Sequence, residues 1–440
     1  MELEMSRSLI RRALLYRWLI FWIMAIAYVI VYFHRLSTAV VAVDLQQAFG
    51  ATGGFIGLLA SAYFYPYALM QFPAGLLSDS LGPRKTVTGF LLLAAVGSVL
   101  FGLAPNKEFA VFARVLVGLG VSMVFIPTMK LLANWFRGHE FAIMTAIVNV
   151  MGGFGALTAA GPLAAMTGWV GWRVSFEIIG AATFFMAIMV WIFVRNRPED
   201  LGWPPISQLD LPAQSAQKRS ETIKPWQGAK IVLSEPHFWP IAIWFFFTCG
   251  LFFSFGGLWA GPYFINVYGL SKSETGSILN MIAVGLIIGS PFYSLLSDKV
   301  LKSRKRVLLL SSLGLALIVG FLNLFPNGLP HYALFFLMLF FSITSSAIVV
   351  IGFTTTKELF PIQIAGTSVG AVNLFPFLGG AIFQPFIGWI LDMYPRTASG
   401  GYPLEAFKSA FFVMLIASII CVITTFFMKD TFPPQTSTPN

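Results

Sequence analysis

Charged residues are scarce in this chain of 440 residues. Asp, Glu, Lys and Arg make up 10% of it, whereas hydrophobic residues make up 57%. Soluble proteins carry roughly 25% charged residues, and a soluble fold of this length cannot hide so much apolar surface in its core. A lipid bilayer solvates such a surface directly. The composition therefore predicts a membrane protein whose permanent partner is the lipid bilayer.

Cysteine is nearly absent too. Cys249 and Cys421 are the only two, and both lie in apolar runs. They allow one disulfide at most, and we interpret them as small buried hydrophobes. No His/Cys cluster has the spacing of a metal site, and no Gly-rich phosphate-binding loop is followed by Lys. We therefore expect no cofactor, no metal and no ATP-driven step.

The net charge of +10 comes from short basic clusters between apolar runs. Cytoplasmic loops of membrane proteins have this pattern, so we expect no nucleic-acid partner. If both termini are cytoplasmic, the segments on their side of the membrane hold 20 of the 28 Lys and Arg residues, and the opposite loops hold 5. This asymmetry predicts a multi-pass protein of the plasma membrane with both termini in the cytoplasm.

Twelve apolar runs are long enough to cross the hydrocarbon, which takes about 20 helical residues. The predicted spans are 18–48, 54–78, 86–104, 109–135, 140–166, 170–194, 238–267, 273–297, 306–325, 331–356, 364–391 and 405–428. The only long polar stretch, 195–236, lies between the sixth and seventh spans. We predict an all-α membrane protein with six-helix bundles at 1–194 and 237–440, the second with a short cytoplasmic tail, joined by a cytoplasmic linker at 195–236.

The two halves repeat each other. The sequence LLSD occurs at 76–79 and at 295–298, and a basic pair follows each copy, at Arg84 and at Arg304. A Val-Asn pair ending at Asn149 recurs at Asn373. The three offsets are nearly the same and close to half the chain length, so they indicate duplication of a six-helix unit. Two related halves place a binding site at their interface, which is typical of a transporter.

The sequence of the repeated loop resembles the signature of a known protein family. GLLSDSLGPRK at 75–85 resembles the loop between helices 2 and 3 of the major facilitator superfamily, and RVLVGLG at 114–120 resembles its fourth-helix signature. The resemblance covers essentially the whole chain. It implies twelve helices in two bundles, a cavity lined by helices 1, 4, 7 and 10, alternating access by rocking, and a monomer in a bacterial inner membrane.

The loop residues are candidates for gating. Asp79 lies at a membrane boundary, where it can pair with a basic residue such as Arg137 or cap a neighbouring helix. Such a latch would hold the cytoplasmic helix ends together when the cavity faces outward. A solvated loop with topogenic charges is the alternative. The predicted gating residues are Gly75, Asp79, Gly82, Arg84, Arg137, Asp298 and Arg304.

Arg35 is the charge that lies deepest in a predicted span. A charge at that depth is costly unless it faces water or a partner. Tyr28 and Tyr32 precede it at i, i+4, i+7 spacing and so share its helix face. A guanidinium between phenols favours a carboxylate or phosphate ligand, although pairing with a carboxylate of another helix is an alternative. His34 is a candidate for proton coupling or a packing residue.

Five further residues are candidates for substrate contacts. Lys130 is either a second anion contact or a snorkelling cation. Asn149 and Asn373 either face the cavity or make hydrogen bonds between helices. Trp259 and Tyr263 flank a Gly-Pro pair that we expect to break the seventh span, and they either stack on substrate or belong to the outer aromatic belt.

The first helix indicates the chemical class of the substrate. YFHR at 32–35 resembles the first helix of the anion:cation symporters and the organophosphate:phosphate antiporters, and RPEDLGWPP at 197–205 resembles the segment after their sixth helix. The symporters usually have an acid where His34 stands, and the antiporters have an arginine near Phe253. One fixed cation deep in the site favours a monoanionic carboxylate.

We therefore predict a secondary active transporter of a small organic anion, a carboxylate or sugar acid, and no enzyme. Proton coupling and exchange for a counter-anion both stay open. An exporter of amphipathic drugs or hydrophobic metabolites is the alternative, based on the Phe-rich seventh span and a Gly-Pro pair at 161–162. A membrane enzyme or sensor is a third, but the chain has no catalytic module to support it.

Overall fold

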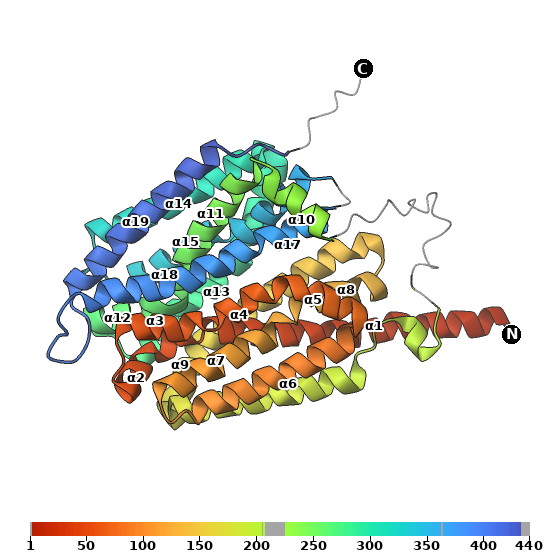
Figure 1. The fold of residues 1–440 in the computed structure, drawn as a ribbon, viewed down its shortest axis with the longest axis horizontal. Helices are drawn as coiled ribbons and strands as arrows, with labels where there is room; N and C mark the ends of the chain where they lie inside the picture. Colours follow the sequence, from red (N-terminus) through yellow and green to blue (C-terminus); the bar gives the residue numbers. More distant parts are fainter. Residues whose placement is uncertain (1, 205, 207–224, 362–363, 433–440) are drawn as a thin grey trace, which may run out of the picture.

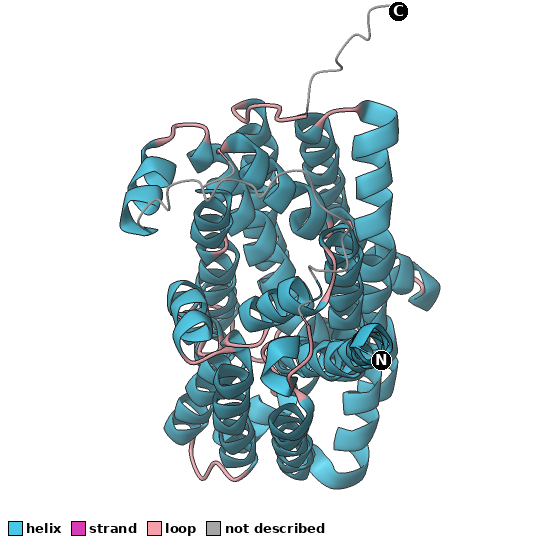
Figure 2. Ribbon diagram, turned by 90° about the vertical axis from the view of Figure 1, so that its right-hand side faces the viewer, coloured by secondary structure: helices cyan, strands magenta, loops and turns pink. Residues whose placement is uncertain are grey.

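The computed structural model describes residues 2–204, 206, 225–361 and 364–432. The predicted linker therefore lies partly, and the C-terminal tail mostly, outside the described residues. Within these ranges every regular element is helical (Figure 2). The helices of the first half are α1 (Glu2–Leu36), α2 (Thr38–Phe49), α3 (Gly53–Ser61), α4 (Phe64–Leu69), α5 (Gln71–Ser80), α6 (Pro83–Gly102), α7 (Lys107–Ser122), α8 (Phe125–Trp135) and α9 (Gly138–Phe193).

The second half follows two short helices in the predicted linker, η1 (Pro198–Leu201) and α10 (Pro225–Ser234). Its elements are α11 (Phe238–Leu251), η3 (Phe252–Trp259), α12 (Ala260–Tyr268), α13 (Lys272–Leu295), η4 (Leu296–Leu301), α14 (Arg304–Leu324), α15 (His331–Ser345), η5 (Ile348–Gly352), α16 (Phe353–Leu359), α17 (Ala365–Val372), α18 (Leu374–Asp392) and α19 (Leu404–Phe426). Three of them, η3, η4 and η5, are π-helical turns.

Ten helical stretches of the described chain are long and apolar enough to cross a membrane. Helix α9 has 56 residues, which at 1.5 Å per residue is far longer than the roughly 30 Å of hydrocarbon. It is kinked at Gly171, whose φ is 76°, so it crosses twice. The second predicted span is divided among α3, α4 and α5, none of which is long enough alone. With α9 counted twice and α3–α5 once, the structure accommodates the twelve predicted crossings.

The seventh span is not broken at its Gly-Pro pair, contrary to the sequence prediction. Helix α12 contains Gly261 and Pro262, and the irregular turn is η3, which comes just before them. A proline clashes with the preceding turn of a regular helix. A wider turn at that point gives the ring room, so the chain continues in the same direction.

The two halves lie side by side, with α1–α9 in red to yellow-green and α11–α19 in green to blue (Figure 1). They meet along α3 against α18 and along α9 against α13. The first crossing requires glycine: a Cβ added to Gly57 would lie 2.4 Å from the carbonyl oxygen of Gln384. Because Gly57 has no side chain, the two backbones pack against each other directly.

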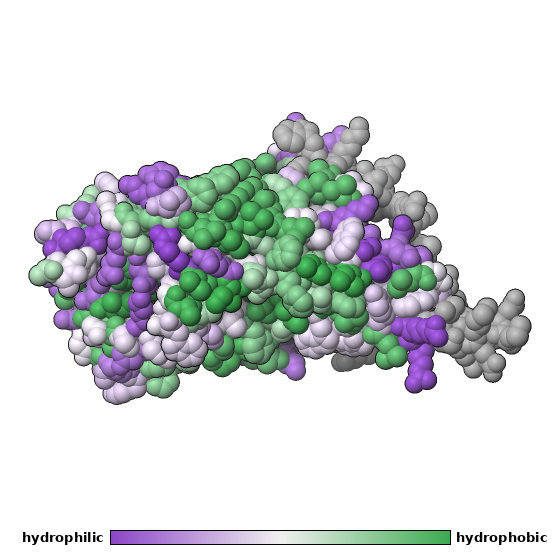
Figure 3. Space-filling view, turned by 90° about the horizontal axis from the view of Figure 1, so that it is seen from below, coloured by the Kyte–Doolittle hydropathy of each residue, from purple (hydrophilic) through white to green (hydrophobic). Residues whose placement is uncertain are grey.

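The outer surface of this bundle is apolar around its middle. Figure 3 shows a hydrophobic band between more polar ends. Many large apolar side chains of the protein face outward, including Leu69 and Leu317, each 74% exposed. Such a surface is unfavourable in water and favourable in lipid. The bundle thus has the surface of a multi-pass membrane protein.

Candidate functional site

A cavity of about 560 Å³ lies between the two halves. The first half lines it with residues of α1, α4, α8 and α9, and the second with residues of η3, α16 and α18, among others. Met129, Phe141 and Lys357 line the part near the ends of α8, α9 and α16. Those ends adjoin the basic loops, so the cavity extends towards the face predicted to be cytoplasmic. The volume fits a small organic ligand.

Arg35 lies in this cavity within a box of aromatic rings. Its guanidinium carbon is 4.5 Å from the ring centroid of Tyr32, 5.0 Å from Tyr67, 5.1 Å from Phe377 and 5.8 Å from Phe253. These rings come from both halves of the protein. Ring faces attract a cation but do not neutralise its charge. No carboxylate of the described chain forms an ion pair with Arg35, and its Nε is buried without a hydrogen-bond partner.

Four other predicted contacts join Arg35 at the cavity. Tyr28 and Tyr32 line it, with ring centroids 5.3 Å apart, as the shared helix face predicts. Asn149 and Asn373 line it from opposite halves. The amide of Asn149 donates to the carbonyl of Thr145 one turn earlier, at 3.0 Å. Each of these residues presents hydroxyl or amide groups that suit a hydroxylated ligand.

Asn373 also connects the halves. Its amide donates to Oε1 of Gln71 at 2.8 Å. Gln71 lies in α5 of the first half and Asn373 at the start of α18 in the second. Both alternatives from the sequence therefore apply to Asn373, which borders the cavity and makes a hydrogen bond between helices.

His34 does not line the cavity. It is fully buried, and its ring nitrogens have no hydrogen-bond partner. Its backbone carbonyl accepts two hydrogen bonds from the guanidinium of Arg114, both 3.2 Å long. Adjacent residues on a helix point about 100° apart, so with Arg35 facing the cavity, His34 packs inside the first half.

Lys130, Trp259 and Tyr263 also lie away from the cavity lining, contrary to their prediction as substrate contacts. The indole of Trp259 donates to the carbonyl of Gln384 at 2.9 Å, and the hydroxyl of Tyr263 donates to the carbonyl of Pro326 at 2.6 Å. Both rings are buried, so neither faces lipid as part of an aromatic belt. They were misassigned because an aromatic pair beside glycine and proline gives no information about which way it faces.

The predicted latch at Asp79 uses a partner that the sequence assigned to the cavity. Lys130 donates to the carboxylate of Asp79, and also to the carbonyl of Ser78 at 3.0 Å. Arg137 instead caps the N-terminus of α9, where its backbone N–H donates to Glu140 at 2.9 Å. The latch in this state therefore joins α5 to α8 within the first half.

The remaining residues of the first loop order the start of α6. Gly82 has a φ of 82° and precedes Pro83 at the helix N-terminus, a conformation that favours glycine. The guanidinium of Arg84 donates to the carbonyl of Trp191 and lies 4.4 Å from its ring centroid. Gly75 has open space where a Cβ would extend. These contacts tie the second, third and sixth spans together at one face.

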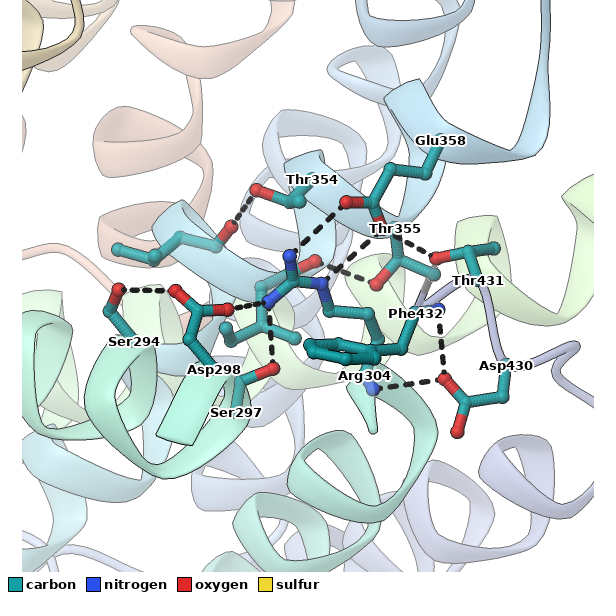
Figure 4. Close-up of polar contacts among 12 residues, drawn as sticks. Ser294, Ser297, Asp298, Arg304, Thr354, Thr355, Glu358, Asp430, Thr431 and Phe432 are labelled. Carbon is teal, nitrogen blue, oxygen red and sulfur yellow. Dashed lines mark hydrogen bonds and ion pairs between the residues drawn. The ribbon is translucent and has the colours of Figure 1, made fainter. Parts of the chain in front are cut away.

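Figure 4 shows the second copy of the latch, which has more partners than the first. Arg304 pairs with Asp298 and, at 3.1 Å, with Glu358 of α16. Asp430 accepts hydrogen bonds from Ser303 and from the first backbone N–H of α14. Burial acts to raise the pKa of Asp430, but these hydrogen bonds outweigh burial and hold the pKa below its ordinary value. The C-terminal segment thereby docks on α14.

The opposite end of the molecule is closed between the halves. Asp392, at the end of α18, accepts hydrogen bonds from the backbone N–H groups of Gly53 and Gly54, both 2.7 Å long. These are the first residues of α3, where a carboxylate also interacts favourably with the helix dipole. Asp44 pairs with Lys272 across the same interface. The ion pairs Lys130–Asp79 and Arg304–Asp298 at the basic face each join residues of one half.

Four cavity residues had no distinguishing signal in the sequence. Tyr67, Phe253 and Phe377 belong to a chain with 45 Phe residues, where an aromatic ring can equally face lipid, another helix or a cavity. Lys357 was counted among the cytoplasmic charges. The residue one helical turn after Phe253 is Gly257, which is not polar. The spacing of polar residues therefore did not indicate which face of the seventh span lines the cavity.

A family model supplies the decisive comparison. The model described as the Major Facilitator Superfamily matches residues 24–382 and 257–440, which together cover most of the chain. The chain belongs to the major facilitator superfamily. The duplicated halves, the loop signature and the central cavity are thereby explained as parts of one transporter architecture, and the protein is a multi-pass membrane transporter rather than an enzyme.

Curated members of the superfamily align along nearly the whole chain. A probable sulfoacetate transporter of Cupriavidus necator is 21% identical, over 92% of this chain and 93% of the relative. A hexuronate transporter of Escherichia coli K12 is 25% identical over 86% and 88%. A membrane sensor protein of Salmonella typhimurium, UhpC, is 24% identical over 84% and 85%.

Solved structures share the fold. A bacterial homologue of the human lysosomal transporter Spinster, in an inward-facing and unoccupied conformation, has a TM-score of 0.72 at 17% identity and covers 94% of this chain and 96% of its own. The inward-facing, occupied form has a TM-score of 0.70 at 19% identity. The likeness shows the two-bundle fold of the superfamily.

Proposed function

We propose that the protein is a secondary active transporter of a small organic anion, a carboxylate or sugar acid, which binds at Arg35. One observation carries this proposal: Arg35 is a cation in the central cavity without a carboxylate to neutralise it among the described residues. A buried cation of this kind is stabilised most by an anion that forms bidentate hydrogen bonds with it. Tyr28, Tyr32, Asn149 and Asn373 add groups for the ligand's hydroxyls.

The relatives support an anionic substrate. They include a probable sulfoacetate transporter, a hexuronate transporter and a putative tartrate transporter, and all three compounds are organic anions. The alternative, an exporter of amphipathic drugs or hydrophobic metabolites, has less support, because the described lining residues include no carboxylate to pair with a cationic drug. The comparison with sugar-acid transporters also agrees with the polar groups around the aromatic box.

Transport by alternating access accounts for the closed and open ends. The end closed by Asp392 and by the Asp44–Lys272 pair would face the outside, and the cavity would open to the cytoplasm, where we place both termini. We propose a monomer of the bacterial inner membrane. Its driving force is either a proton gradient or exchange for a counter-anion, and uptake into proteoliposomes with and without an imposed pH gradient separates the two.

The proposal is tested at Arg35. Purified protein is screened by thermal shift against carboxylates, sugar acids, phosphate esters and amino acids, because a ligand of the folded state raises its apparent stability. The best ligand is then used for uptake into proteoliposomes. We expect Arg35→Gln to lower uptake at least about 100-fold, the loss of a charge-assisted bidentate contact, while the protein stays folded.

Arg306→Gln is the matched control. Arg306 is an exposed arginine at the start of α14 and does not line the cavity. Uptake by Arg306→Gln should therefore equal that of the wild type. Unaltered uptake by Arg35→Gln would contradict the proposal. So would a screen in which amphipathic drugs stabilise the wild-type protein and no anion does.

A further inference from the structure

We infer that Lys357 is a second anion-binding group of the cavity and that the substrate is an organic dianion. This inference rests on the proposed function and makes its substrate class specific. The sequence favoured a monoanion because Arg35 was the only cation identified deep in the site. The structure adds a cation from the other half of the protein.

Lys357 lies near the end of α16 and lines the same cavity as Arg35. Its side chain is exposed to the cavity mouth, and it forms no ion pair or hydrogen bond with another described residue. Lysine presents three donors on a flexible stem. It can therefore follow an anion from the mouth of the cavity towards Arg35.

The neighbouring carboxylate is already neutralised. In Glu358, Oε1 accepts from Arg304 at 3.1 Å, and Oε2 accepts from Arg304 at 3.3 Å and from Thr431 at 2.8 Å (Figure 4). Both oxygens thus point into the latch and away from the cavity. Adjacent residues of α16 point about 100° apart. The charge of Lys357 consequently remains available to a ligand.

The cavity therefore has two cations and, among its described lining residues, no carboxylate. Arg35 belongs to the first half and Lys357 to the second. A monoanion bound at Arg35 would leave Lys357 uncompensated when the cavity closes and water is excluded, which is unfavourable for a charge. A dianion with one negative group for each cation neutralises both and connects the two halves.

Matched ligands test this inference. Each pair consists of an aldarate, with a carboxylate at both ends, and the aldonate of the same length, with a carboxylate at one end: tartronate with glycerate, tartrate with threonate, and galactarate with galactonate. Binding to the purified full-length protein is measured by titration. We expect at least one aldarate to bind about tenfold more tightly than its aldonate, which corresponds to about 1.4 kcal/mol.

The variants assign that preference to a residue. Lys357→Gln should reduce the ratio of the two dissociation constants to about 1 by weakening the aldarate, and Lys357→Arg should preserve the ratio because it keeps the charge. Lys299→Gln removes an exposed lysine at the same face outside the cavity and should behave as wild type.

The inference is overturned if Lys357→Gln keeps the aldarate preference, or if the wild type binds no aldarate more tightly than its aldonate. Either result leaves the proposed function intact as long as Arg35→Gln abolishes binding of both ligands. If Arg35→Gln binds them as tightly as wild type does, the proposed function itself is wrong, whatever Lys357 does.

Discussion

Arg35 is held by ring faces instead of by a carboxylate. Each ring face contributes roughly 0.5–2 kcal/mol to a nearby cation, which helps to offset the loss of hydration in the box of Tyr32, Tyr67, Phe253 and Phe377. The rings leave the guanidinium's charge unneutralised. This arrangement fixes the position of the cation and keeps its affinity for an incoming anion.

The sequence could identify Arg35, Tyr28 and Tyr32 because a charge in an apolar run is rare and helical spacing assigns its face. It could not identify Phe253 or Phe377, since a phenylalanine of a membrane bundle can pack equally well against lipid, another helix or a cavity. The sequence did not predict Lys357 as a cavity residue for a different reason. A lysine near the end of a span is usually an interfacial charge, and only the packing of α16 turns it towards the cavity.

His34 is the residue whose role the structure changes most. Because its ring is buried away from the cavity, we expect His34→Gln to keep the pH dependence of transport measured in proteoliposomes between pH 5.5 and about 8, the range in which an accessible histidine would titrate. Total uptake should fall at most a few-fold through altered packing. A pH profile that becomes flat in this variant would restore His34 as the proton site.

Asp392 and Asp430 both cap the N-terminus of a helix, but at different places in the protein. Each accepts backbone N–H groups at the start of a helix, but Asp392 caps α3 of the other half and Asp430 caps α14 of its own. Only the first contact must break when the halves separate at the closed end. The two residues therefore form a natural pair for measuring what holds that end shut.

Asp392→Asn should open the closed end more often. Loss of the charged acceptor weakens two hydrogen bonds, so we expect roughly a tenfold shift in the equilibrium between the two states. The measurement is labelling of Ala39→Cys, a buried position at the α2–α12 contact, by an impermeant maleimide added outside cells, with Cys249 and Cys421 replaced by serine. Asp430→Asn should leave the labelling rate unchanged, and equal rates in both variants would refute this role of Asp392.

Whole helices were predictable only where hydrophobicity is continuous. The long runs of α6, α14 and α19 match their predicted spans within a few residues. The second span was predicted as one helix but consists of α3, α4 and α5, with breaks at residues 62–63 and 70. Pro66 and Pro73 follow these interruptions, and a proline removes a helical hydrogen bond and clashes with the preceding turn, so hydropathy alone missed breaks that the prolines explain.

At the scale of the molecule, closure of one end depends on the approach of α3 to α18. Gly57→Val would place side-chain atoms where the backbone of Gln384 and Pro385 lies, within 2.4 Å for the Cβ alone. Overpacking of this kind costs about 1–3 kcal/mol, so we expect the closed state to be lost and uptake of the Arg35 ligand to fall at least about tenfold. Gly89→Val is the control, because nothing lies within 4 Å of its Cβ position, and comparable losses in both variants would contradict the prediction.

The unneutralised Arg35 has a consequence for the empty protein. To return without cargo, the cavity must close around a bare cation, and burying such a charge is costly. The loaded protein closes around a neutral pair instead. The barrier to reorientation is therefore lower when an anion is bound. The residue that binds the substrate thus also limits reorientation of the empty protein. Efflux of a labelled anion should accelerate when unlabelled anion is present on the far side.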